Sequence, residues 1–384
     1  MFFAPFRRLQ DIDSFFEEDD LFTELEESLS DDLAFDSSEV PYFGTLTLDM
    51  LHRLLVPMWK KTHKMVEGET ILHYALKQTN QSTLRMLIEE HGQDVEMLDG
   101  RRNSPLHVAV NLGLVQSVAT LIRAGADINK RNADGITALQ IAAKEASEME
   151  DTSVNFRHII YLLLGAGADI NAITVVTSRT ALHIACIFGN VKEALPLLQC
   201  GAAHSMLDRF GCTPLHFAAR HGSHRDIVAL LMAFGASANV YNYANTSALH
   251  DACTLSDDPE SILLVMVCFD VDLGQLDNEG SSVLHNADMD RNLMDALVNN
   301  MEDDLDLLDL ENRSGNTPIH HMAIRYRKEG NVIPPEVLRS MELLLKHGAS
   351  ILHKNQVGMT IFDTSTMFNL HEVIALLNTE VRYR

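Results

Sequence analysis

A short pattern of apolar and polar residues recurs along this chain and predicts where its helices begin. Each copy opens with Thr or Ser, followed by Pro or an apolar residue, then Leu or a similar residue, usually His, and an Ala shortly after. A Thr or Ser hydroxyl accepts a hydrogen bond from the free amides of a helix N-terminus, and Pro fits the first helical position. The copies start at Thr70, Ser104, Thr137, Thr180, Thr213, Ser247, Ser282, Thr317 and, in a weaker form, Thr360.

A second helix is predicted to follow the first in each copy. About eight residues after the start comes a small or glycine turn, as at Gly113 and Gly189, and then an apolar pair such as Leu197 and Leu198. The second helices end at Gly-Ala, where glycine adopts the left-handed conformation that terminates a helix. The segments between copies are polar and rich in turn residues, so they predict projecting loops. The terminating glycines are Gly125, Gly167, Gly201, Gly235 and Gly348.

The length of the repeat and its recurring residues are typical of one family. Most copies start about 33 to 35 residues apart, and this period together with the Thr-Pro-Leu-His phrase is that of ankyrin repeats. From Thr70 to the C-terminus the chain resembles the ankyrin repeat family, with eight to nine repeats. The resemblance implies an all-α solenoid of stacked helix-turn-helix units with projecting loops, in which partners bind across the loops and the first helices.

Two kinds of departure interrupt the regular repeat. The copies that start at Thr137 and Thr317 carry about nine extra residues between their helices, which predicts loop insertions near 145–155 and 326–336. The copies within 247–315 lose the Gly-Ala ending and become acidic. We therefore expect the stack to be degenerate there, and to bend or loosen.

The chain before the first copy is predicted to close one end of the stack. Leu54 and Leu55 stand about 15 residues before Thr70, the offset that separates a second-helix apolar pair from the next copy. A solenoid needs an atypical terminal unit to cover its exposed core. Residues 39–68 are therefore predicted to form an N-terminal capping helix or partial repeat, and residues 69–384 the repeats themselves.

Charge and cysteine usage narrow the classes of partner. The formal net charge of −24 disfavours the phosphate contacts of direct nucleic-acid binding and adsorption to anionic lipid. No apolar run approaches the roughly 20 residues that cross a bilayer, and the opening apolar segment is too brief for a signal peptide. Five scattered cysteines without a Cys-x-x-Cys pair suit a reducing compartment. An intracellular protein, in the nucleus or the cytoplasm, is expected.

The abundant histidines are assigned a structural role. Seven of the 18 occupy the fourth position of the repeated pattern, and a catalytic or metal site does not need seven copies. Because buried polar groups are hydrogen-bonded, we expect these rings to bind the neighbouring loop and the Thr or Ser hydroxyl. The seven are His73, His107, His183, His216, His250, His285 and His320.

No motif in the sequence predicts catalysis. His221 and His224, with Asp226 nearby, form a local cluster, but no fourth ligand stands at a zinc-motif spacing, so a polar turn is the better interpretation. Nucleophile elbows, phosphate loops, dinucleotide fingerprints and zinc-protease motifs are missing from the sequence. We expect no enzyme activity, no catalytic residues, no cofactor and no metal.

Candidate partner-binding residues follow from the register that the resemblance implies, which selects residues just before each Thr or Ser and those seven and eight positions after it. Arginine and aromatic residues, which are enriched at interface hot spots, dominate this set and favour an acidic or phosphorylated partner segment. Phe210 and Arg220 are both expected to be exposed. The alternative is ordinary solvated loops with aromatics tucked against the next repeat. The set is Arg101, Arg102, Arg179, Phe188, Arg209, Phe210, Arg220, His221 and Tyr243.

The first 38 residues differ in kind from the rest of the chain. Before residue 40 stand thirteen acidic residues against two arginines, with seven of the 16 phenylalanines. Acids mixed with bulky apolar residues are the composition of transcriptional activation segments. Apolar residues at helical spacing also predict an amphipathic helix that forms on a partner. The residues expected to make that contact are Phe15, Phe22, Leu25 and Leu29.

Two other roles stay open for this acidic, partly disordered arm, residues 1–38. Its helix would dock on the N-terminal cap in one of them. In the other, the arm would fold over the arginine-rich groove and mask it.

The preferred interpretation is a non-enzymatic interaction scaffold that acts as an ankyrin-repeat transcription coregulator. The alternative is a cytoplasmic adaptor or effector, for example one that presents substrates to a ligase. In both cases the partners are other proteins, bound through the repeat groove and the acidic arm, with no direct nucleic acid and no membrane. Alone, the chain is expected to be monomeric.

Overall fold

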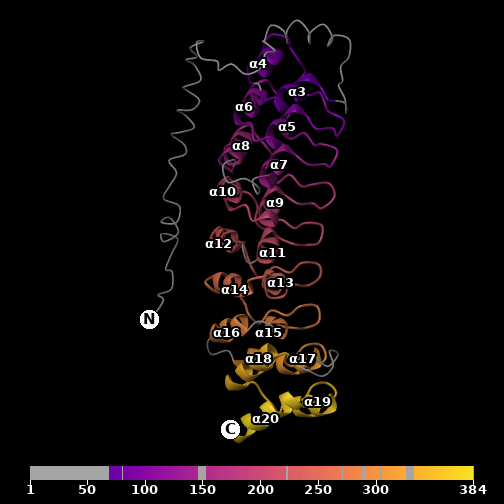
Figure 1. Ribbon diagram of the computed structural model, residues 1–384, viewed down its shortest axis with the longest axis vertical. Helices are drawn as coiled ribbons and strands as arrows, with labels where there is room; N and C mark the ends of the chain where they lie inside the picture. The colour runs from indigo at the N-terminus through magenta and orange to yellow at the C-terminus, as the bar shows by residue number, and fades with distance from the viewer. Residues whose placement is uncertain are drawn as a thin grey trace, which may run out of the picture.

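Pairs of helices stack into one elongated column in the computed structural model (Figure 1). The structure describes residues 69–383 except 80, 146–152, 222–223, 270, 288–290, 302–304 and 326–332. Within this part the regular structure is helical, apart from two isolated antiparallel bridges that join Tyr241 to Ser247 and Leu276 to Ser282. The all-α solenoid of helix-turn-helix units predicted from the repeats is confirmed.

Each unit contributes one inner and one outer helix, and Figure 1 shows the two kinds as separate columns with the loops projecting beside the inner one. The inner helices are α3 (Ile71–Lys77), α5 (Pro105–Asn111), α7 (Ala138–Glu145), α9 (Ala181–Phe188), α11 (Pro214–Ala219), α13 (Ala248–Leu255), α15 (Val283–Asn286), α17 (Pro318–Arg325) and α19 (Ile361–Met367). The outer helices are α4 (Gln81–Glu89), α6 (Val115–Arg123), α8 (Ser153–Gly165), α10 (Val191–Gln199), α12 (Arg225–Ala233), α14 (Pro259–Val267), α16 (Arg291–Asn299), α18 (Pro335–Lys346) and α20 (His371–Tyr383).

The inner helices begin where the repeated pattern predicts. At α9, Thr180 has an extended backbone, and its hydroxyl accepts a hydrogen bond from the backbone amide of His183. In return, Nδ1 of His183 accepts from the backbone amide of Thr180 over 3.2 Å. This reciprocal capping satisfies two amides that the helix itself leaves free. The same arrangement opens α3, α5, α11, α15 and α19.

Left-handed glycines end the helices. Gly189 caps α9 with a φ of 70°, and Gly201, which follows α10, has a φ of 87°. Residues with a side chain rarely adopt such a backbone, so glycine fixes the point at which the chain turns.

The hydrophobic core runs along the whole column between neighbouring units. On α9, Leu182, Ala185 and Cys186 are fully buried, and this helix packs against α7 and α11. Leu197 on α10 is buried in the same way, against α8 and α12. Burial raises the pKa of the Cys186 thiol far above its ordinary value, which disfavours the reactive thiolate.

Several predicted segments lie wholly or largely outside the described residues. They are the acidic arm 1–38 with Phe15, Phe22, Leu25 and Leu29, the capping unit 39–68, and most of both insertions, which fall between α7 and α8 and between α17 and α18. Within 247–315, α15 has four residues, whereas α13 has eight, and a short 3-10 helix, η6 (Leu305–Asp309), follows α16. The loosening of the stack there stays a prediction.

Candidate functional site

One Asp or Asn at the start of most described loops holds the loop in shape. Oδ1 of Asp208 accepts hydrogen bonds from the backbone amides of Phe210 and Cys212, over 2.8 and 3.0 Å. Asn242 does the same for the next loop. Loops that are ordered before binding lose little entropy when a partner binds. The equivalent residues of other loops are Asp99, Asn132, Asp277, Asn312 and Asn355.

The tips of neighbouring loops are joined directly to one another. The backbone amide of Arg209 donates to the carbonyl of Thr177 over 2.9 Å, and that of Tyr243 donates to the carbonyl of Phe210 over 3.0 Å. The ring of Tyr243 lies across Gly211, because a Cβ atom on this glycine would stand 2.6 Å from the ring. The tips therefore form one continuous surface over successive repeats.

The central part of this surface exposes apolar side chains. Val175 is 71% exposed, Val176 64%, Phe210 58% and Tyr243 75%, and they come from three consecutive loops. We call these four residues the fingertip patch. In most other described loops, a charged or polar residue stands at the position that corresponds to Phe210. These residues are Arg101, Asp134, Glu279 and Ser314.

Arginine and phenylalanine side chains from α11 and from the chain next to α9 and α11 lie close together near the patch. Phe217 on α11 is buried, and its ring is close to two guanidinium groups. The Cζ atom of Arg179 is 4.5 Å from the ring centroid, and that of Arg220 is 4.8 Å from it. Both distances suit cation–π attraction, which is strongest where water is partly excluded.

Buried carboxylates fix both arginines. Nε of Arg179 lies 3.3 Å from Oδ2 of Asp208, and the guanidinium of Arg220 lies 3.0 Å from Oδ2 of Asp251. The two aspartate side chains are 0% and 6% exposed, and that of Arg220 is 29% exposed. The expectation that Arg220 is exposed is therefore wrong, because an acid from the next repeat pairs with it. We call Arg179, Phe217 and Arg220, with these two aspartates, the arginine layer.

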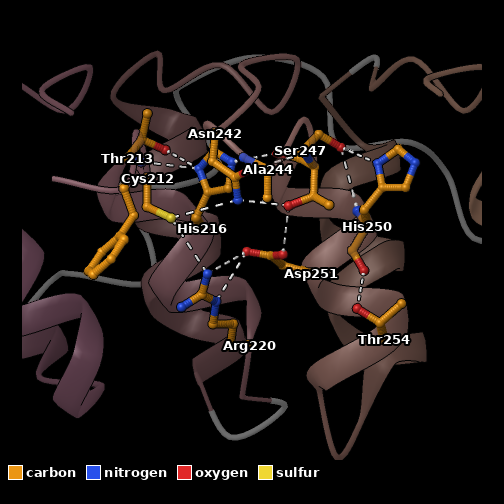
Figure 2. Close-up of polar contacts among 12 residues, drawn as sticks. Cys212, Thr213, His216, Arg220, Asn242, Ala244, Ser247, His250, Asp251 and Thr254 are labelled. Atoms are coloured by element: carbon orange, nitrogen blue, oxygen red, sulfur yellow. Dashed lines mark hydrogen bonds and ion pairs between the residues drawn. The ribbon is translucent and has the colours of Figure 1, made fainter. Parts of the chain in front are cut away.

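A hydrogen-bond network continues from the arginine layer into the next loop (Figure 2). Oδ1 of Asp251 accepts from the Thr246 hydroxyl over 3.2 Å, and that hydroxyl accepts from Nδ2 of Asn242 over 2.7 Å. Arg220 also donates to Sγ of Cys212, over 3.5 Å. Side chains of α11, of the loop that follows α12 and of α13 are thereby held in one arrangement.

The predicted groove residues fall into three groups. The first group lies together in and beside the two surfaces defined above. Phe210 and Tyr243 belong to the fingertip patch, Arg179 and Arg220 belong to the arginine layer, and Arg209 stands at their edge. Phe188 and His221 are exposed, but they stand at or just after the C-terminal ends of α9 and α11, roughly 12 Å from the loop ends of these helices. Arg101 and Arg102 are exposed in a loop nearer the N-terminus. Their part in binding stays a prediction.

Sequence reasoning missed five residues of this surface: Phe217, Asp208, Asp251, Val175 and Val176. Asp251 was visible as an acid at a position where α9 and α11 carry Ile184 and Phe217. The two valines were visible as an apolar pair inside a segment predicted to project into solvent.

The repeated histidines have the predicted structural role. Nε2 of six of them lies 3.0 to 3.2 Å from a backbone carbonyl of the next loop, as His183 does from that of Cys212. Because Nδ1 accepts, Nε2 carries the proton and donates. Burial lowers the pKa of His183, His285 and His320 to about 4, so their rings are neutral at pH 7.

The described residues contain neither a cluster of metal-binding side chains nor a membrane-spanning helix. Within the described residues, no three His, Cys, Asp or Glu side chains are placed to hold a metal ion, although the rings of His221 and His224 lie 4.9 Å apart. Among the described helices, none is both long and apolar enough to cross a membrane.

Stacked units with a rigid row of loops define a repeat protein of the solenoid class. The family model for three copies of the ankyrin repeat matches residues 43–132, 106–201, 149–242 and 182–262, and that for a single ankyrin repeat matches 314–356. This chain belongs to the ankyrin repeat family, whose repeats are interaction modules.

The curated relatives include a subunit of a nuclear factor. The Nuclear factor NF-kappa-B p105 subunit of Mus musculus is 34% identical over 176 residues, which cover 45% of this chain and 17% of that protein. The B-cell lymphoma 3 protein homolog of Mus musculus is 29% identical over 216 residues, 55% of this chain and 46% of that protein. The chain thus spans less than half the length of these relatives.

Solved structures agree on the fold. The ankyrin repeat domain of Bcl-3, described as a unique member of the IkappaB protein family, superposes with a TM-score of 0.52 at 26% identity, covering 60% of this chain and 99% of that one. The ankyrin repeat domain of human ASB11, at 24% identity and a TM-score of 0.51, supports the fold alone.

Proposed function

We propose that this chain is a transcription coregulator that binds other proteins across the fingertip patch and the arginine layer, without catalysing a reaction. The observation that carries the proposal is the exposure of Phe210 and Tyr243 on loops that are already rigid. Large aromatic side chains in a solvent-exposed row are the kind of anchor that dominates protein interfaces. The partner segment that fits combines apolar side chains, for the patch, with acidic groups, for the exposed Arg209 beside it.

The relatives support the regulatory part of this proposal. A subunit of a nuclear factor and a member of the IkappaB family each match part of this chain. A coregulator acts in the nucleus, so nuclear localisation is part of the proposal.

The test compares partners captured by the full chain and by two variants. Phe210→Ser with Tyr243→Ser removes the aromatic anchors, and Val357→Ser changes an equally exposed residue at the same loop position of the last described loop. Losing two hot-spot residues of about 2 kcal/mol each weakens binding by more than a hundredfold. We expect transcription regulators to be captured by the natural chain and by V357S, and lost from F210S/Y243S. Capture that is unchanged in the double variant would contradict the proposal.

The second candidate is the adaptor. It draws on a match to the E3 ubiquitin-protein ligase KEG of Arabidopsis thaliana, 28% identical over 210 residues that make up 13% of that protein. Ligase subunits in place of transcription regulators among the partners that depend on Phe210 and Tyr243 would select it.

A further inference from the structure

The fingertip patch leaves a large apolar area exposed to solvent. Its four side chains are each more than half exposed and come from adjoining loops. Soluble proteins rarely expose such a contiguous area unless a ligand or partner covers it.

Cations border this patch on its N-terminal side. Arg209 is exposed next to Phe210, and Arg131 donates to the carbonyl oxygen of Ile173, beside Val175. Arg101 and Arg102 continue the row towards the N-terminus, with one exposed acid, Asp134, between them and the patch, whereas the loop after the patch carries Asp277 and Glu279. The patch with its cationic border therefore suits a segment with both bulky apolar and acidic residues.

The chain itself contains a segment of this chemistry. Residues 11–35 carry eleven acidic residues and no basic one, with four phenylalanines and four leucines among them. Acids alone would be attracted to the arginines, and the phenylalanines and leucines supply the apolar groups that the patch needs. The segment is complementary to the patch in both respects.

The tether is long enough for contact within one chain. The patch lies on the loops that precede α9, α11 and α13, three to five units from α3. Since packed helices lie 8–10 Å apart, that separation is roughly 30 to 50 Å. The 24 residues from Phe15 to Ser38 span about 80 Å when extended, so Phe15 reaches the patch even if residues 39–68 fold as a capping unit.

We infer that residues 11–35 dock on the fingertip patch of their own chain and compete with the partner for it. The inference rests on the proposed function, because the patch is the same surface. A tethered segment acts at an effective concentration of about 1 mM, so an arm with an intrinsic dissociation constant of ~0.1 mM weakens partner binding about tenfold. Access to the patch is thus regulated from within the molecule.

The test places a photo-crosslinking residue in the patch of the full chain. Phe210→benzoylphenylalanine keeps an aromatic ring at an exposed position, and Val357→benzoylphenylalanine is the matched control. After irradiation and trypsin digestion, mass spectrometry identifies the crosslinked peptide. We expect the label at 210 to capture the peptide 9–53, which lies between Arg8 and Arg53, with a yield that does not change on dilution. The yield falls severalfold in 0.5 M salt and in the variant F15A/F22A/L25A/L29A.

Other results overturn the inference. No crosslink from 210 to peptide 9–53 rejects it, as does an equal yield from 357. A yield that rises with protein concentration shows contact between two copies in place of contact within one chain. If the crosslink is absent while partner capture still depends on Phe210 and Tyr243, the docking fails and the proposed function stands. If the crosslink forms while capture ignores these residues, the docking stands, and the proposed function fails together with the competition that rests on it.

Discussion

Nε2 of His183 donates a hydrogen bond over 3.1 Å to the backbone carbonyl of Cys212, 29 residues further along the chain. The same ring accepts from the amide of Thr180 through Nδ1, so one side chain joins the start of its own helix to the loop of the next repeat. In the third repeat Gln140 takes this place, with Nε2 donating to the carbonyl of Ala172 over 2.7 Å and Oε1 accepting from Thr137.

The repeated buried histidines, such as His183, make the stability of the protein dependent on pH. Burial lowers the pKa of His183 from 6.5 to about 4 in the folded state, so the unfolded chain binds this proton more readily. The contribution of the neutral His183 ring to the free energy of unfolding is complete above pH ~6.5. It is lost as the pH falls from 6.5 towards 4, and at pH 5 the loss is about 2 kcal/mol.

His183→Gln should remove this part of the pH dependence, because Gln140 shows that an amide makes the same contacts. Urea unfolding at pH 7.5 and pH 5 measures it, and the difference in free energy of unfolding between the two should shrink by about 2 kcal/mol. His347→Gln, at an exposed position, serves as the control and should leave the difference unchanged. An H183Q protein as pH-sensitive as the natural one would contradict the assignment.

The pair formed by Arg220 and Asp251 should contribute measurably to stability. Arg220→Ala removes a contact with Phe217 and leaves a carboxylate that is almost fully buried without its cation, so we expect a loss of about 1–3 kcal/mol in urea unfolding. Arg209→Ala, which changes an exposed residue, should stay within about 0.5 kcal/mol. In a double-mutant cycle with Asp251→Ala, the coupling energy should exceed about 0.5 kcal/mol. Additive losses would show that the two side chains act independently.

Gly211 should tolerate a side chain less well than Gly201. Both have a positive φ, 75° and 87°, so alanine strains the backbone at either position by about 1 kcal/mol. A Cβ atom on Gly201 meets nothing within 4 Å, whereas one on Gly211 would stand 2.8 Å from the backbone nitrogen of Tyr243. Thermal unfolding should therefore show a larger loss for G211A than for G201A. Equal losses would mean that the contact between the two loop tips adds nothing.

The acidic arm should work through its apolar side chains and not through charge alone. Changing Phe15, Phe22, Leu25 and Leu29 to Ala keeps every carboxylate and slightly raises helix propensity. Burying four such side chains contributes about 6 to 10 kcal/mol before ordering costs of several kcal/mol. Residues 1–40 fused to a DNA-binding domain should activate a reporter, and the quadruple variant should not. Equal activity would show that the acids suffice, and a silent natural arm would favour the adaptor.

Local patterns along the chain predicted the repeat architecture, because residues within each repeat determine where its helices begin and end. Thr180 and Gly189 act on neighbouring backbone atoms, and the same signals return in nearly every copy. A periodic sequence needs no long-range information to define such units.

The arginine layer could not be predicted from local patterns, because its contacts join residues of different repeats. Arg220 is paired by Asp251, 31 residues away, and stacks on Phe217 of its own helix. Register shows that a residue faces the groove, but it does not show which acid of the next repeat will cover it. The fingertip patch was recovered in part, since Phe210 and Tyr243 stood at groove positions, whereas the loop of Val175 departs from the common spacing.

The four-residue helix α15 has a mechanical consequence. A solenoid is cooperative only as far as each unit is held by its neighbours, and the inner helix of this unit has four residues where the other described inner helices have six to eight. Heated or pulled from its ends, the column should part first at α15, leaving the block that carries the fingertip patch folded while the block beyond it frays. The partner-binding surface would then stay folded after the part of the protein on the C-terminal side of α15 has unfolded.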